Sequence, residues 1–209
     1  MSSISKFDKS KAIRGGIPVV FPQFGRPDEA MAQHGFARNS MWSFEDGIFS
    51  LTESEDTLKV WPHSFRLALS FSLEGKKTII IALEVTNTGV SAPLECQTLL
   101  HTYLKVPHIA GTSVKGFEGL IYKDHLGDRS YRENEKGDVN SIDREIDRVY
   151  QDFPVDRTVS VMCSDSLQYD VKAGASIDGE PTSIDVVFWN AWVDKSRATA
   201  DLDDDGYLH

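Results

Sequence analysis

The chain has 209 residues, and 32 acidic against 22 basic residues give a formal net charge of −10 at pH 7. Its length suits one folded domain, and 40% hydrophobic and 10% aromatic residues are typical of a globular protein. The acidic balance argues against nucleic acid or an anionic membrane as the main partner, because both attract positive charge. Without an apolar run at the N-terminus or a stretch of about 20 apolar residues, we expect a cytoplasmic protein.

The first candidate binding segment is an arginine followed by two glycines, Arg14-Gly15-Gly16. Glycine allows unusual backbone angles, and a guanidinium held beside such a turn presents a planar fork to a phosphate group. The alternative is a plain loop with a solvated arginine. The glycine patterns of nucleotide-binding loops are absent, so the sequence does not predict a nucleotide site.

A second candidate segment, residues 33–39, carries Gln33, His34 and Arg38 around Gly35. These side chains suit a polar ligand, although the composition is equally that of a capped turn. The spacing alone therefore leaves both interpretations open.

Alternating apolar and polar residues predict strands along most of the chain. The predicted strands are residues 65–72, 78–85, 94–106, 158–163, 167–171 and 183–189. Frequent turn residues between these runs favour antiparallel neighbours joined by short loops. We therefore predict an all-β, antiparallel β-sandwich that forms a single domain over residues 1–209.

The predicted strand around His101 has a polar and aromatic face. A period of two places Gln97, His101 and Tyr103 together, as on a carbohydrate-binding sheet. Histidine titrates near neutrality and suits general acid or base catalysis. The alternative is a hydrogen-bonded structural histidine.

Two charged segments precede the last strands. Residues 123–147 predict a long exposed connection or an irregular hairpin, and the alternating charges of residues 143–150 predict a solvated edge strand. Residues 195–201 predict one or two helical turns. The acidic residues 201–206 match the opening of a calcium loop, but the chain ends before the required glutamate, so we expect an acidic turn.

Two distant cysteines, Cys96 and Cys163, form no metal-binding or redox motif. A disulfide between them is one alternative, and two free, buried thiols in a reducing compartment are the favoured one.

Taken together, the motifs of the chain resemble the hexose-6-phosphate mutarotase (glucose-6-phosphate 1-epimerase) branch of the aldose 1-epimerase superfamily. The segments that carry this resemblance are residues 12–25, 33–39, 100–103, 119–124, 146–150 and 188–192. The resemblance implies a galactose mutarotase-like supersandwich that binds a hexose 6-phosphate and needs neither a metal nor a redox cofactor.

The resemblance also implies residue roles. His101 would be the general acid. Arg14, Gln33 and Arg38 would bind substrate, with the arginines on the phosphate, and Asp147 would hold sugar hydroxyls. His34 lies in a matching motif and is a candidate pocket residue.

Family members have further strands before the segment that matches residues 5–11, and their general-base glutamate follows the segment that matches residues 201–209. The resemblance therefore implies a chain without its terminal strands and without that base. The alternative function is a sugar-phosphate-binding module without turnover, or an incomplete fragment. Exposed edge strands would then favour self-association.

Overall fold

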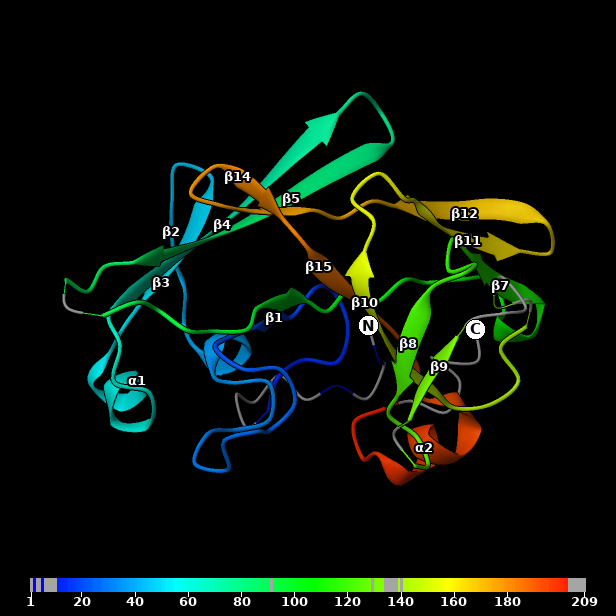
Figure 1. The fold of residues 1–209 in the computed structure, drawn as a ribbon, viewed down its shortest axis with the longest axis horizontal. Coiled ribbons are helices and arrows are strands. Elements are labelled where there is room, and N and C mark those ends of the chain that lie inside the picture. Colours follow the sequence, from blue (N-terminus) through cyan, green and yellow to red (C-terminus); the bar gives the residue numbers. More distant parts are fainter. Residues whose placement is uncertain are drawn as a thin grey trace. The chain divides into compact units, whose positions relative to one another are not determined.

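The computed structural model describes residues 2, 5, 11–90, 92–128, 130–133, 139 and 141–202 (Figure 1). The chain forms two compact units. The N-terminal unit is residues 6–103, and the C-terminal unit is residues 104–209 together with residues 1–5. Every pair of neighbouring strands described in either unit is antiparallel.

The N-terminal unit is built around a four-stranded sheet in the order β2-β3-β4-β5. Its elements are β1 (Val19–Val20), a 3-10 helix η1 (Ala37–Asn39), β2 (Ser43–Glu45), β3 (Ile48–Thr52), α1 (Glu55–Val60), β4 (Phe65–Glu74), β5 (Thr78–Asn87) and β6 (Leu99–Leu100). The predicted strands at residues 65–72 and 78–85 are confirmed as β4 and β5. The alternation along β4 buries Phe65, Leu67 and Leu69 on one face.

The aromatic core of this unit centres on Phe21, which is fully buried. Its ring centroid lies 5.0 Å from that of Phe65 and 5.2 Å from that of Trp61. Phe21, which directly follows β1, therefore anchors the chain in the core and fixes the position of the loops before and after it.

The strand predicted at residues 94–106 is wrong in its extent, because only Leu99 and Leu100 form a strand, β6, paired with β1. The segment that lies alongside contains Pro18 and Pro22, whose carbonyls accept hydrogen bonds from His101 and Gln97. Proline has no N–H to donate in return, so a regular two-way ladder cannot continue past these positions.

The C-terminal unit holds three further sheets, in the orders β15-β10-β8-β9, β12-β11-β7 and β13-β14 (Figure 1). Its elements are a 3-10 helix η2 (Ile109–Gly111), β7 (Thr112–Lys115), β8 (Ile121–Asp124), β9 (Tyr131–Glu133), β10 (Ile146–Phe153), β11 (Val159–Cys163), β12 (Ser166–Val171), β13 (Ala175–Ile177), β14 (Glu180–Thr182), β15 (Ile184–Asn190) and α2 (Trp192–Ala198). The predicted strands at residues 158–163, 167–171 and 183–189 are confirmed as β11, β12 and β15.

The prediction of a solvated edge strand at residues 143–150 is wrong. β10 lies between β15 and β8, and the Tyr150 side chain is fully buried. The Tyr150 ring stacks on Phe117 with ring centroids 4.0 Å apart. The apolar residues of this strand therefore decide its position, while Asp147 and Arg148 are half-buried and Asp152 is exposed.

Other local predictions have mixed outcomes. The segment 123–147 overlaps the β8–β9 hairpin, which begins two residues earlier, so the hairpin alternative is confirmed, although residues 134–138 and 140 lie outside the described residues. The predicted helical turns occur as α2, which begins three residues earlier than predicted. Both cysteines are free thiols: Cys163 is buried as expected, but Cys96 is exposed. Residues 203–209, with most of the acidic turn, lie outside the described residues. In the part of the chain that is described, no helix has the length and apolar character needed to cross a membrane.

Candidate functional site

In the N-terminal unit, the segment around Arg14 runs alongside the segment that carries His101. The backbone N–H of His101 donates to the Pro18 carbonyl at 3.0 Å, and that of Tyr103 donates to the Gly16 carbonyl at 3.0 Å. Gly16 adopts a left-handed backbone conformation with φ of +70°, which glycine accepts without strain. These two backbone hydrogen bonds hold the segment of Arg14 beside the segment of His101, and the charge of Arg14 acts on the His101 imidazole.

The His101 imidazole stacks on Tyr103, with ring centroids 4.7 Å apart and 21° between the ring planes. Both side chains therefore lie on the same side of their segment, as the period of two predicted. The tyrosine ring restricts the rotation of the imidazole, which favours a fixed direction for its N–H groups.

Both the backbone and the side chain of His34 form hydrogen bonds with the backbone of Gly25. Its backbone N–H donates to the Gly25 carbonyl at 2.7 Å, and its Nδ1 accepts the Gly25 N–H at 3.1 Å. An accepting Nδ1 means a neutral imidazole whose proton is on Nε2. Burial, followed by the charge of Arg38, lowers the pKa of His34 to about 4, in agreement with that hydrogen bond.

The next residue, Gly35, also has a left-handed backbone conformation, with φ of +70°. A Cβ at Gly35 would collide with the carbonyl oxygen of Phe21. The close approach of these two backbones brings the His34 loop onto the core, so that the His34 ring centroid lies 6.3 Å from that of His101.

Arg38 is a half-buried residue of η1, and its Nη2 donates to the Gln33 carbonyl at 2.8 Å. The Gln33 side chain itself is exposed. The structure therefore gathers Arg14, His34, Arg38 and His101 in one unit, and we call these four residues the His101 cluster.

Electrostatics in the His101 cluster disfavour additional positive charge. Burial is the main cause that lowers the pKa of His101, and the charges of Arg38 and Arg14 lower it further, while a hydrogen bond of its own backbone raises it. An anion bound beside the two arginines would offset their charge and raise the pKa of His101. The cluster thus combines anion attraction with an imidazole whose pKa would respond to the anion.

Asp147 belongs to the C-terminal unit, where it lies on β10. Its Oδ1 is 3.7 Å from Nδ1 of His125, and the His125 backbone N–H donates to the Asp147 carbonyl at 2.8 Å. Burial raises the pKa of the Asp147 carboxyl, as do the charges of Glu145 and Asp124, while His125 and Lys195 act in the opposite direction. Sequence reasoning did not identify His125, which stands outside any recognised motif.

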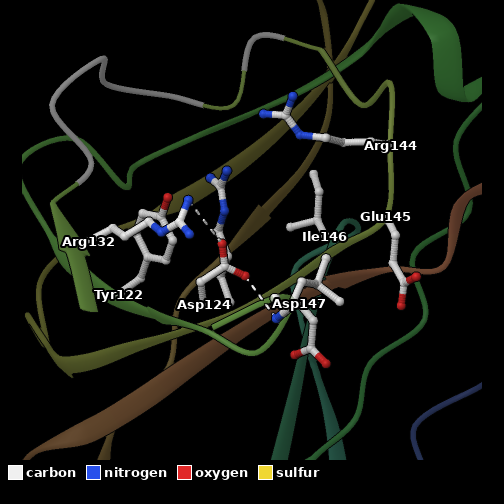
Figure 2. A pocket seen from close by; sticks show the side chains of 10 residues that line it. Tyr122, Asp124, Arg132, Arg144, Glu145, Ile146 and Asp147 are labelled. Carbon is white, nitrogen blue, oxygen red and sulfur yellow. Dashed lines mark hydrogen bonds and ion pairs between the residues drawn. The ribbon is translucent and has the colours of Figure 1, made fainter. Parts of the chain in front are cut away.

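A cavity of about 460 Å³ lies beside β8 and β10 in the same unit (Figure 2). It is lined by Tyr122, Asp124, Leu126, Gly127, Arg132, Arg144, Glu145, Ile146, Asp147 and Arg148. Within it, Arg132 pairs with Asp124 at 3.7 Å and the Arg148 guanidinium lies 4.5 Å from the Tyr122 ring centroid. These arginines were not among the sequence-based candidates. Arg132 lies in the segment predicted as an exposed connection or irregular hairpin, and Arg148 lies in the predicted solvated edge strand.

Metal ligands do not gather in the part of the chain that is described: no group of three or more His, Cys, Asp or Glu side chains lies close enough to hold an ion. The polar groups of the His101 cluster are two guanidinium groups and two imidazoles. That donor set suits an anionic, hydroxylated ligand better than a cation.

Comparison with known proteins identifies relatives along almost the whole chain. A family model described as aldose 1-epimerase matches residues 2–209. A candidate glucose-6-phosphate 1-epimerase of Cenchrus ciliaris is 32% identical over 222 residues, which cover 99% of this chain and 64% of the relative. One from Escherichia coli K12 is 35% identical over 218 residues, which cover 99% of this chain and 68% of the relative. The chain thus spans about two thirds of the length of these relatives.

Solved structures agree with the sequence matches. The crystal structure of a candidate mutarotase from Salmonella typhimurium superposes with a TM-score of 0.81 at 28% identity, over 99% of this chain and 68% of that one. A Synechocystis protein superposes with a TM-score of 0.54 at 18% identity and shows the same fold over 76% of this chain. The prediction of an all-β, antiparallel, galactose mutarotase-like fold is confirmed.

Proposed function

Because this chain belongs to the aldose 1-epimerase family, we propose that it interconverts the α and β anomers of a hexose 6-phosphate, with glucose 6-phosphate as the favoured substrate. The observation that carries the proposal is the His101 cluster, in which two arginines and a half-buried His101 meet in one unit. A phosphorylated sugar is a substrate of the cell interior, so the proposal includes a cytoplasmic location.

In the proposed complex, Arg14 and Arg38 bind the 6-phosphate. Guanidinium groups form paired, charge-assisted hydrogen bonds with phosphate oxygens. Arg38 is already oriented by its bond to the Gln33 carbonyl, so little side-chain freedom is lost when the phosphate binds. The neutral His34 offers its Nε2–H as a further donor. A separate expectation, from the family resemblance, is that Asp147 of the C-terminal unit accepts hydrogen bonds from sugar hydroxyls.

His101 acts in this proposal as the general acid. It donates a proton to the ring oxygen while a base removes the proton of the anomeric hydroxyl, and the bond between C1 and the ring oxygen breaks. The open-chain aldehyde rotates about the C1–C2 bond, and closure on the other face of the carbonyl reverses both proton transfers. Binding of the phosphate dianion raises the pKa of His101 and so favours the protonated form that the first step needs.

The second candidate function is sugar-phosphate binding without turnover. One observation favours it: the charged groups that lower the pKa of His101 are the guanidinium groups of Arg38 and Arg14, which can bind an anion without any base. A binding module would keep the arginines and the affinity but would not accelerate anomer exchange.

Magnetisation-transfer NMR on glucose 6-phosphate distinguishes the two functions, with a buffer blank that measures spontaneous exchange. Enhanced exchange that falls by about 10²–10⁴-fold in His101→Ala supports the enzyme. Binding by calorimetry without enhanced exchange supports the module. Neither binding nor exchange, from protein with a folded circular-dichroism spectrum, rejects both.

A further inference from the structure

The four-stranded sheet of the N-terminal unit carries an exposed apolar surface near the C-terminal end of β4. Register places Phe44, Phe49, Phe71, Leu73 and Ile79 on one face, since Phe44 pairs with Phe49, Phe49 with Leu69, and Leu73 with Ile79. We call these five residues the apolar sheet end. It continues the same face that buries Leu67 and Leu69.

Exposure of the apolar sheet end is large for such side chains. Leu73 is 78% exposed, Ile79 64%, Phe44 62%, Phe71 48% and Phe49 37%. The aromatic members also contact one another, with ring centroids 4.6 Å apart for Phe44 and Phe49. Single exposed apolar residues are ordinary, but a contiguous exposed group marks a surface that associates.

The apolar sheet end adjoins an open strand edge. Among the described strands, β5 pairs on one side only, with β4. β5 is ten residues long, and its ten pairs with β4 run without a register shift. It contains no proline and one charged residue, Glu84. Long, regular, uncharged edges invite pairing, and natural proteins usually protect them with charge, proline or a bulge.

We propose that this surface is a dimer interface in which β5 pairs antiparallel with β5 of a second copy of the chain. A two-fold axis at Ile81 keeps both apolar faces on the same side of the extended sheet, because opposed residues then have the same parity. On the apolar face, Ile79 then lies opposite Leu83 of the other copy. On the other face, Glu84 lies opposite Thr78 and one diagonal step from Lys76, so charges of opposite sign meet.

A second copy fits better than a highly charged partner for two reasons. The first reason is that the surface is apolar, and the second is that the open edge is self-complementary in charge about Ile81.

The formal charge of −10 on each chain opposes association, and salt screens that repulsion. The dimer is therefore expected to tighten when the salt concentration rises from about 0.05 to about 0.5 M.

Light scattering coupled to size exclusion, on the whole chain, tests the proposal. We expect twice the mass of one chain, and a single-chain mass for the double variant Leu73→Lys/Ile79→Lys. The control is the double variant Met41→Lys/Ile177→Lys, which places the same two charges at residues 80% and 67% exposed outside this sheet and leaves the dimer intact. A single-chain mass for the unchanged protein at micromolar concentration, or a dimer that persists in the double variant, would overturn the proposal.

Cross-linking tests the register. With Cys96→Ser to remove the exposed thiol, Ile81→Cys is expected to form a disulfide between copies, because a residue on the axis faces itself. Thr86→Cys, five residues away from the axis, is expected to remain reduced. The reverse pattern, or cross-linking of both at equal rates, would reject pairing about Ile81.

Discussion

A glutamine in place of Arg38 removes one guanidinium from the His101 cluster while keeping a polar side chain of similar length. Arg38 is half-buried and oriented by the Gln33 carbonyl, so its bond to a phosphate is of the charge-assisted kind, worth about 2 kcal/mol. We therefore expect kcat/KM for glucose 6-phosphate to fall by roughly 30-fold. The rate with free glucose has no phosphate to lose and is expected to change little.

The same substitution lowers kcat/KM but is expected to extend activity to higher pH. Arg38 lowers the pKa of His101, so its removal raises that pKa in the free protein. Activity that requires protonated His101 is lost as the pH rises through this pKa, so the alkaline limb of kcat/KM moves to higher pH in Arg38→Gln. A variant that is weaker overall and yet keeps its activity to higher pH is not expected from a general loss of structure.

Anomer exchange measured by NMR across pH 5–9 provides both quantities on one sample series. The matched control is Arg26→Gln, since Arg26 also donates from Nη2 to a backbone carbonyl of the same unit, that of Glu29 at 3.0 Å. Arg26→Gln is expected to behave as the unchanged protein. Equal losses with glucose and glucose 6-phosphate, or an alkaline limb that stays in place, would refute the coupling between the phosphate site and His101.

Three further predictions concern other parts of the sites. His101→Asn keeps a polar group but cannot protonate the ring oxygen, so kcat is expected to fall by about 10²–10⁴-fold while calorimetry shows little change in affinity for the sugar phosphate; unchanged kcat would remove the acid role. Asp147→Asn is expected to raise KM by roughly 10-fold for both phosphorylated and free glucose, through loss of a charged acceptor; an effect on kcat alone would contradict hydroxyl binding. Gly35→Ala is expected to unfold at a lower temperature than Gly25→Ala, because both pay about 1 kcal/mol for a left-handed backbone but only Gly35 would collide with the Phe21 carbonyl; equal melting temperatures would argue against the close backbone approach.

The sequence predicted strands well where apolar side chains point to one face of the sheet and polar side chains to the other. Along β4, apolar residues alternate with polar ones, and the pattern alone identifies the core face. It fails at residues 94–106, because the extent of that strand depends on prolines about 80 residues earlier in the chain. No local pattern reveals which distant segment will lie alongside.

The candidate site was predictable in part for a related reason. Arg14, Gln33, His34, Arg38 and His101 lie in motifs that resemble a known family, and the structure brings four of them together. The His125–Asp147 pair lies across neighbouring strands, and its geometry depends on the register between β8 and β10. The charges around Asp147 and Arg148 suggested solvent exposure, whereas Arg148 in fact covers the ring of Tyr122.

The pairing of the proline-containing segment with residues 97–103 has a consequence for observing the site. Three backbone amides, those of Gln97, His101 and Tyr103, donate to carbonyls of residues 16–22. Amide protons engaged in this way exchange slowly with deuterated solvent, whereas proline has no amide proton to exchange. The His101 amide can therefore report on the site by hydrogen exchange: a ligand that tightens this part of the unit slows deuterium uptake at the same residue whose imidazole is the proposed proton donor.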